Sequence, residues 1–180
     1  MLLVERSSRP GGTVTHSLIH TLAGLHDAGG ELINGGLPAE LTERLQQSSP
    51  LTSRRKIGRT WTLSVDPAVY EQVVEDWLEE LAGLTLLREA TVSAITRQGK
   101  SVEAVEVVKG GERVSVQPNA VVDATGTAEL VRQFDPGLVE DDRQAAAGLI
   151  FTLSGVDTEL LRFPRGMVLL QAIRKAAGEG

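Results

Sequence analysis

Apolar and polar positions change pattern several times along the chain, and the first change is the most informative. Residues Leu2–Val4 form an apolar run that ends at the acidic residue Glu5, and a polar stretch then leads to Gly11-Gly12. This pattern predicts a β-strand over 2–5 and a tight glycine turn. Beyond the turn, leucines at helical spacing predict a helix over 13–25.

The clearest helical pattern follows Asp66 and Pro67. Asp66 suits the N-cap because its carboxylate can accept from free backbone N–H groups, and Pro67 suits the first helical position. A shorter helix is expected around Pro38, and the polar segment 46–59 lacks periodicity and is expected to be a surface loop. The apolar face of the main helix carries Val69, Val73, Trp77 and Leu81.

Three segments of mixed alternation, 91–97, 102–108 and 113–116, are joined by glycine-containing turns. They predict a three-stranded antiparallel β-meander at about 90–118. The other apolar runs predict a buried strand over 84–87, a buried strand over 120–126 that ends at a glycine turn, a helix over 128–134, a strand over 149–153 and a helix over 166–177.

Composition narrows the classes of function. The chain has 180 residues, a net charge of −6 and no basic run longer than three residues, so we do not expect a nucleic-acid partner. No apolar stretch approaches the ~20 residues of a membrane span, and we expect a cytoplasmic protein without a membrane partner. The chain has 0 cysteines, so electron chemistry would require a bound organic cofactor.

The acid and the glycines at the start suit a dinucleotide site. The carboxylate of Glu5, at the end of a strand, can accept hydrogen bonds from a ribose diol. Gly11 and Gly12 allow the backbone to approach a flat ring or a pyrophosphate. The glycine fingerprint expected ~20 residues before such an acid is missing, so the sequence is expected to begin inside a nucleotide-binding unit.

Taken together, these segments resemble the FAD-dependent oxidoreductases of the glutathione-reductase-like FAD/NAD(P)-binding superfamily. The likeness lies in the acid-plus-Arg strand end, the Gly-Gly turn, the Asp66 helix, the meander and the strand ending Asp123-Ala124-Thr125-Gly126. It implies an α/β fold, an incomplete Rossmann-like three-layer domain with an antiparallel β-meander and its first strand missing. Residues 1–148 would form this partial FAD-binding domain, and 149–180 the beginning of a substrate or cap region.

The resemblance also implies roles for single residues in binding FAD. Glu5 would bind the adenosine ribose, and Arg6 would lie beside the adenine. The backbone of Val92 would meet the adenine edge. The resemblance implies further cofactor contacts for Gly11, Gly12, Thr13, Ala124, Thr125 and Gly126.

Two parts of the family pattern are missing, namely the first strand with its phosphate-binding turn and the C-terminal part. In the family's strand order the first strand lies between the strands at 2–5 and 120–126. We therefore expect a fragment that alone is aggregation-prone or partly disordered. The oligomeric state stays open, although an exposed sheet edge favours association into a homo-oligomer.

The histidines give a weaker indication of function. His16 and His20 are four residues apart, a spacing also found in zinc sites, but no third ligand is evident and no metal is expected. In the family setting His16 would run along the flavin, where it could donate a proton or a hydrogen bond. The competing interpretation is a partly buried, hydrogen-bonded histidine.

The sequence thus predicts an FAD-dependent oxidoreductase that acts on an unidentified small molecule, with no nameable catalytic residue. The alternative is a non-catalytic remnant or interaction module that cannot hold FAD, which the missing phosphate turn favours. A third interpretation assigns Glu5 to NAD binding. The long insertion between Glu5 and Asp123 fits the flavoprotein order better.

Overall fold

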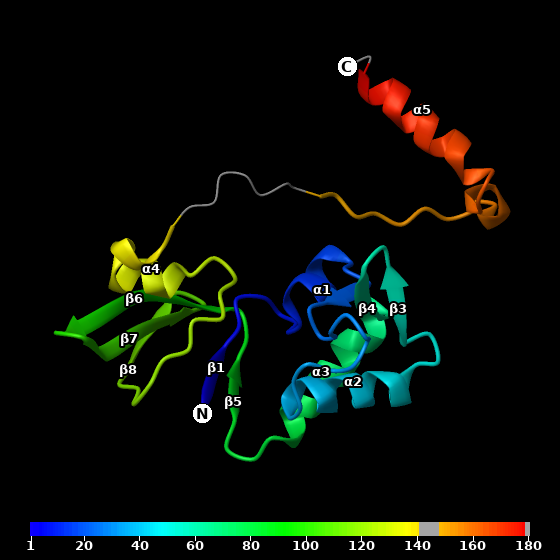
Figure 1. Ribbon diagram of the computed structural model, residues 1–180. Coiled ribbons are helices and arrows are strands. Elements are labelled where there is room, and N and C mark those ends of the chain that lie inside the picture. Colours follow the sequence, from blue (N-terminus) through cyan, green and yellow to red (C-terminus); the bar gives the residue numbers. More distant parts are fainter. Residues whose placement is uncertain (141–147, 179–180) are drawn as a thin grey trace. The chain divides into compact units, whose positions relative to one another are not determined.

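The computed structural model describes residues 1–140 and 148–178 (Figure 1). The chain divides into two compact units, Met1–Gly148 and Leu149–Gly180. The first unit is a mixed α/β structure with one parallel and two antiparallel sheets. The second unit contains only helical elements among its described residues.

The parallel sheet pairs β1 (Leu2–Val4) with β5 (Thr85–Leu87), so that Leu3 lies opposite Leu86. Both strands were predicted from their apolar runs, and both are confirmed. The ladder continues past the end of β1: the Glu5 backbone N–H donates to the Leu87 carbonyl at 2.9 Å. Since the strands are parallel, their carboxyl ends meet at one edge, and Glu5 lies at that edge.

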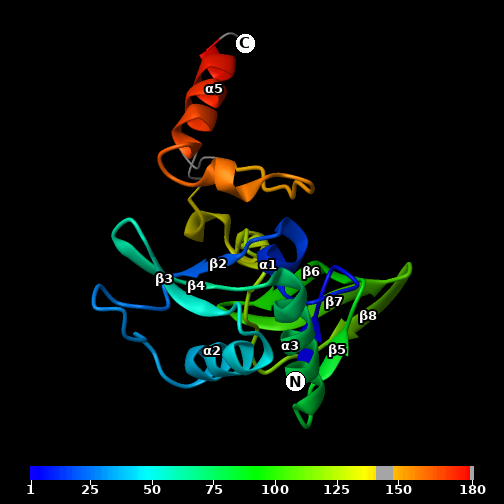
Figure 2. The ribbon, with the colours of Figure 1, turned by 90° about the vertical axis from the view of Figure 1, so that its right-hand side faces the viewer.

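Between these two strands the chain builds a helical and antiparallel layer. It consists of α1 (Gly12–Ser17), β2 (Thr21–Ala23), α2 (Leu37–Ser48), β3 (Ser53–Ile57), β4 (Thr60–Ser64) and α3 (Pro67–Glu80), with sheet order β2-β4-β3. Figure 2 shows α2 and α3 beside this sheet. One core cluster joins them, made of Val14, Leu45, Leu63, Val65 and Val73.

The start of α3 agrees with its predicted cap. The Asp66 side chain accepts a hydrogen bond from the Ala68 backbone N–H at 2.9 Å, and Pro67 occupies the first turn. Val73 on the predicted apolar face is buried, whereas Leu81 lies just beyond the helix and is 42% exposed. The N-cap and the proline therefore position the helix as the sequence indicates.

The predicted helix over 13–25 is wrong beyond Ser17. Leu18 adopts a left-handed conformation with φ of 54°, which ends α1, and Thr21–Ala23 extends as β2 beside β4. Leu22 faces Leu63 in that pairing and packs against the same core. Leu22 thus reaches the core as part of a strand, although the leucine spacing had predicted a helix. Pairing with a distant strand overrides the local pattern.

The predicted loop over 46–59 is also wrong. Helix α2 continues to Ser48, and Ser53–Ile57 forms the edge strand β3, which turns through Gly58 into β4. All residues of β3 are exposed. An edge strand needs only backbone partners on one side, so it can be entirely polar and leave no alternation to detect.

The meander is confirmed. Strands β6 (Ala90–Gln98), β7 (Ser101–Lys109) and β8 (Glu112–Val116) pair antiparallel in that order. Its buried residues Ala90, Val105 and Val107 pack with Val4 and Leu87, so the meander lies against the parallel strands. The predicted helix α4 (Glu129–Phe134) contacts β6, where Arg97 donates to the Phe134 carbonyl at 3.0 Å.

Two predicted strands, over 120–126 and 149–153, are wrong. Neither segment pairs with another strand in the described part of the chain. Val122 and Leu149 are each 86% exposed. A strand exists only through the hydrogen bonds of a neighbouring strand, and without that neighbour the apolar side chains stay in solvent.

The remaining elements are helical. In the first unit, η1 (Pro136–Leu138) follows α4. In the second unit, η2 (Thr158–Leu161) precedes α5 (Gly166–Gly178), the helix predicted over 166–177, and α5 has no buried residue. Across residues 1–140 and 148–178, no helix combines the length and apolar character that crossing a membrane requires.

The core joining α2, β4 and α3 gives a stability prediction. Leu63 is fully buried, so Leu63→Ala should lower the free energy of unfolding by about 2–5 kcal/mol through lost contacts and a residual cavity. Leu51, 71% exposed, provides the matched control, and Leu51→Ala should change it by less than about 0.5 kcal/mol. Urea unfolding measures both, and equal losses would contradict this core.

Candidate functional site

The site begins with Glu5 at the carboxyl end of β1. Its backbone is held on both sides, since its N–H donates to Leu87 and its carbonyl accepts from the Ala90 N–H at 3.0 Å. The side chain is half-buried, and its Oε1 accepts from the Ser7 N–H at 2.8 Å and the Ser7 hydroxyl at 2.5 Å. No described residue donates to Oε2, so that oxygen keeps its capacity to accept a hydrogen bond.

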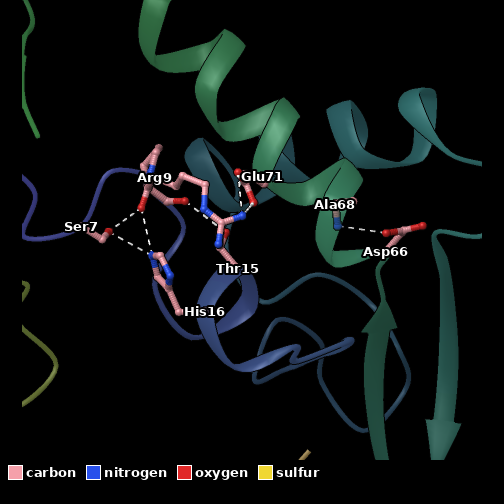
Figure 3. A network of polar contacts seen from close by, with 8 residues as sticks. Ser7, Arg9, Thr15, His16, Asp66, Ala68 and Glu71 are labelled. Atoms are coloured by element: carbon pink, nitrogen blue, oxygen red, sulfur yellow. Dashed lines mark hydrogen bonds and ion pairs between the residues drawn. The ribbon is translucent and has the colours of Figure 1, made fainter. Parts of the chain in front are cut away.

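Ser7 connects Glu5 to helix α1, and Figure 3 shows the contacts of Ser7 with Arg9 and His16. Its Oγ lies 2.6 Å from the Arg9 carbonyl oxygen and 3.0 Å from His16 Nε2. His16 Nε2 is also 3.0 Å from the same Arg9 carbonyl. Glu5, Ser7 and His16 thus form one continuous polar network. Ser7 was not among the site residues predicted from the sequence.

The loop between the acid and the glycines is anchored to helix α3 as well. The Arg9 guanidinium donates to both carboxylate oxygens of Glu71, at 2.9 and 3.2 Å. The Thr15 hydroxyl donates to the Pro10 carbonyl at 3.1 Å. These contacts fix the loop before any ligand is present, which is the geometry that precise binding requires.

The two glycines of the turn have different surroundings. Gly11 has φ of 115°, and a Cβ there would lie 2.1 Å from Thr15 Oγ1 and 3.2 Å from Thr15 Cβ. Gly12 has φ of 56°, and a Cβ there would meet nothing within 4 Å. Gly11 is therefore required by packing, whereas Gly12 presents its backbone to open space, as close approach of a ring or a diphosphate demands.

The other predicted contacts near β1 lie in different settings. Arg6 and Thr13 are exposed. Val92 lies in β6 opposite Val107, packs against the second core cluster and is followed by a β-bulge. Since β6 begins at Ala90, which is bonded to Glu5, the backbone leading to Val92 starts beside the acid.

The glycine turn after residue 123 was predicted to end a strand. In the structure it belongs to the cap of helix α4 instead. The Asp123 carboxylate accepts from the backbone N–H groups of Thr125, Leu130 and Val131 at 2.9–3.0 Å. The Thr125 hydroxyl donates to Asp123 and accepts from the Glu129 N–H. Ala124, Thr125 and Gly126 are exposed, and no hydrogen bond between described residues joins them to Glu5 or the Gly11-Gly12 turn.

Two further residues, His20 and Trp61, lie elsewhere in the first unit. His20 follows α1, so it shares no helix face with His16, and the described residues contain no cluster of metal-binding side chains. The Trp61 ring lies under Arg54 and Lys56, whose cationic groups are 5.2 and 5.6 Å from the ring centroid. Its Nε1 donates to the Ala28 carbonyl at 3.2 Å, so Trp61 holds the loop before α2.

A surface hollow of about 570 Å³ lies along α3 but is unsuited to a diphosphate. Its charged lining holds more carboxylates than guanidiniums, and two of the carboxylates already pair with Arg9 and Arg88. Such a surface repels anions. The acidic residues are Glu71, Glu75, Asp76 and Glu79.

Comparisons with known proteins identify the family. The sequence profile of the FAD dependent oxidoreductase family matches residues 1–175, and the chain belongs to this family. The predicted resemblance is confirmed at this level. A search of curated proteins found no match.

The fold is similar to that of solved structures, as the following example shows. The crystal structure of Thermovibrio ammonificans THI4 resembles the chain with a TM-score of 0.50 and 15% sequence identity. The likeness covers 75% of this chain and 52% of that chain, so this chain spans about half the length of THI4. At this identity the similarity concerns the fold alone.

Gly11 and Gly12 give a matched pair of stability predictions, because packing requires a glycine only at Gly11. Gly11→Ala should lower the free energy of unfolding by more than about 2 kcal/mol, because its Cβ would displace the buried, hydrogen-bonded Thr15. Gly12→Ala should lower the free energy of unfolding by about 1 kcal/mol, because only its left-handed backbone conformation disfavours a side chain. Equal losses in urea unfolding would contradict the assignment.

Asp123 gives a pH prediction. Desolvation raises the pKa of its carboxyl, but hydrogen bonds from the Thr125 side chain and the backbone outweigh this and hold the pKa below the usual 3.8. The resulting stabilisation is present above 3.8 and lost as the pH falls through the lower folded-state pKa.

Asp123→Ala should therefore lower the free energy of unfolding by about 1 kcal/mol at neutral pH, as expected for a lost cap. The difference from the wild type should shrink as the pH falls from neutrality through the lowered pKa of the wild-type Asp123 carboxyl. Urea unfolding across this range measures it. A difference that stays constant with pH would contradict the cap.

Proposed function

We propose that this chain forms part of the FAD site of an FAD-dependent oxidoreductase of the glutathione-reductase-like superfamily, acting on a small molecule. The observation that carries the proposal is Glu5: a half-buried carboxylate at the carboxyl end of a parallel strand, with Oε2 open to a ligand hydroxyl. Carboxylates in this place bind the ribose of dinucleotides. The family match supports FAD as the dinucleotide.

The residues of this chain bind and orient the cofactor. Glu5 accepts from the adenosine ribose, and the open backbone at Gly12 allows close approach. FAD, when bound, supplies hydride or electron transfer. Arg6 beside the adenine and the backbone of Val92 at its edge follow from the resemblance. So do the contacts assigned to Gly11, Thr13, Ala124, Thr125 and Gly126.

The proposed division of labour follows the two units. Residues 1–148 contribute the nucleotide-binding part, and 149–180 begin the region that contacts substrate. The exposed apolar residues of the second unit, among them Phe163 and Leu170, fit a segment that packs against further protein. We propose a cytoplasmic enzyme without nucleic-acid partners, whose substrate and electron acceptor stay open.

A second candidate is a non-catalytic remnant or interaction module that cannot hold FAD. The observation that favours it is the segment 120–126, which is exposed and forms no strand. In a complete nucleotide-binding sheet this segment would lie beside the phosphate-binding turn. Binding of FAD decides between the two candidates.

The test is titration of the purified chain with FAD, followed by flavin fluorescence. The wild type should bind, and Glu5→Gln should weaken binding about 10- to 100-fold, because a hydrogen bond to a charged group contributes about 1.5–3 kcal/mol. Glu103→Gln, at an exposed position of β7, is the matched control and should bind as the wild type.

The outcomes separate the candidates. Absence of FAD binding by the wild type would contradict the proposed function and favour the remnant. Binding that is unaffected by Glu5→Gln would leave FAD binding in place and contradict the role of Glu5.

A further inference from the structure

We propose that Ser7 and His16 are positioning residues that orient the Glu5 carboxylate toward its ligand. This inference rests on the proposed function and deepens it. It concerns side chains that touch the acid directly or through one contact, and no role in the reaction itself is assigned to them. Figure 3 shows the part of the network formed by Ser7, Arg9 and His16.

The Ser7 hydroxyl has more acceptors around it than protons to donate. The Ser7 hydroxyl carries one proton, but three acceptors lie near its oxygen: Glu5 Oε1 at 2.5 Å, the Arg9 carbonyl at 2.6 Å and His16 Nε2 at 3.0 Å. A carboxylate and a carbonyl can only accept. The direction of this single proton therefore decides how firmly Glu5 is held.

His16 determines that direction. Its Nε2 lies 3.0 Å from the Arg9 carbonyl, and this contact is a hydrogen bond only if Nε2 carries the proton. With Nε2–H as the donor, the Arg9 carbonyl is satisfied and Ser7 can give its proton to Glu5. The bond to the carboxylate is the stronger of the two choices, because a charged acceptor strengthens a hydrogen bond.

The same arrangement selects which carboxylate oxygen remains available. Ser7 donates to Oε1 twice, through its backbone N–H and its hydroxyl. Both bonds fix the rotation of the carboxylate and leave Oε2 for a ribose hydroxyl. The Arg9 carbonyl is itself fixed, because the guanidinium of the same residue is bound to Glu71 on α3.

The ligand that such a site favours is a diol next to an adenine base. Because the acid is oriented in advance, a ligand hydroxyl meets a carboxylate that has little rotational freedom left to lose on binding. Loss of Ser7 or His16 should thus weaken binding without removing any direct ligand contact.

The test compares the FAD affinity of the full chain with that of substituted variants, and the readout is the flavin fluorescence titration. Ser7→Ala should weaken binding about tenfold, and Ser7→Thr, which keeps a hydroxyl, should restore most of it. Ser8→Ala, at the exposed neighbouring position, is the control and should bind as the wild type. His16→Ala should weaken binding about threefold, because the Arg9 carbonyl then competes with Glu5 for the Ser7 proton.

Non-additivity distinguishes positioning from general destabilisation. Adding His16→Ala to Ser7→Ala should cause no further loss, since His16 acts through the Ser7 proton. His16→Gln, whose amide can donate to the Arg9 carbonyl, should bind more tightly than His16→Ala. This pair keeps the test decisive if Ser7→Ala does not fold.

The results that overturn the inference are distinct from those that overturn the proposed function. If the wild type binds FAD and Glu5→Gln weakens binding, but Ser7→Ala and His16→Ala bind as the wild type, the positioning role is wrong and the function stands. Additive losses in the double variant, with no rescue by threonine or glutamine, would also overturn it. A wild type that fails to bind FAD overturns both.

Discussion

The pairing of β1 with β5 is the constraint on which the candidate site depends. It joins the start of the chain to residues more than eighty positions later, and the Glu5 backbone extends the ladder to Leu87 and Ala90. Because the meander begins at Ala90 and packs under Val4 and Leu87, one short parallel ladder places the acid between two layers. The side chain of Glu5 owes its position to these backbone bonds.

Where local chemistry determines an element, the sequence was sufficient to predict it. The Asp66 cap, the following proline and the glycine turns of the meander carry their own signals, and α3 and β6–β8 appear as expected. Where partners distant in sequence decide, prediction failed: Leu22 reaches the core from a strand, and the polar edge strand β3 has no apolar face to reveal it. Residues 120–126 have the composition of a buried strand but no strand beside them.

The same distinction applies to the site. Glu5 and the glycine turn could be found from residue types and spacing, but the separation of roles between Gly11 and Gly12 required the position of Thr15. Ser7 and Arg9 were missed, because their importance arises from contacts with Glu5, His16 and α3. A hydroxyl two residues beyond the acid is the single hint that the sequence offers.

A crystal structure of the chain with FAD would show whether the Glu5 carboxylate holds the adenosine ribose. We expect a ribose hydroxyl within about 3 Å of Glu5 Oε2, while Ser7 remains bonded to Oε1. An adenosine bound away from the end of β1, or a ribose held by other groups while Glu5 faces solvent, would contradict it.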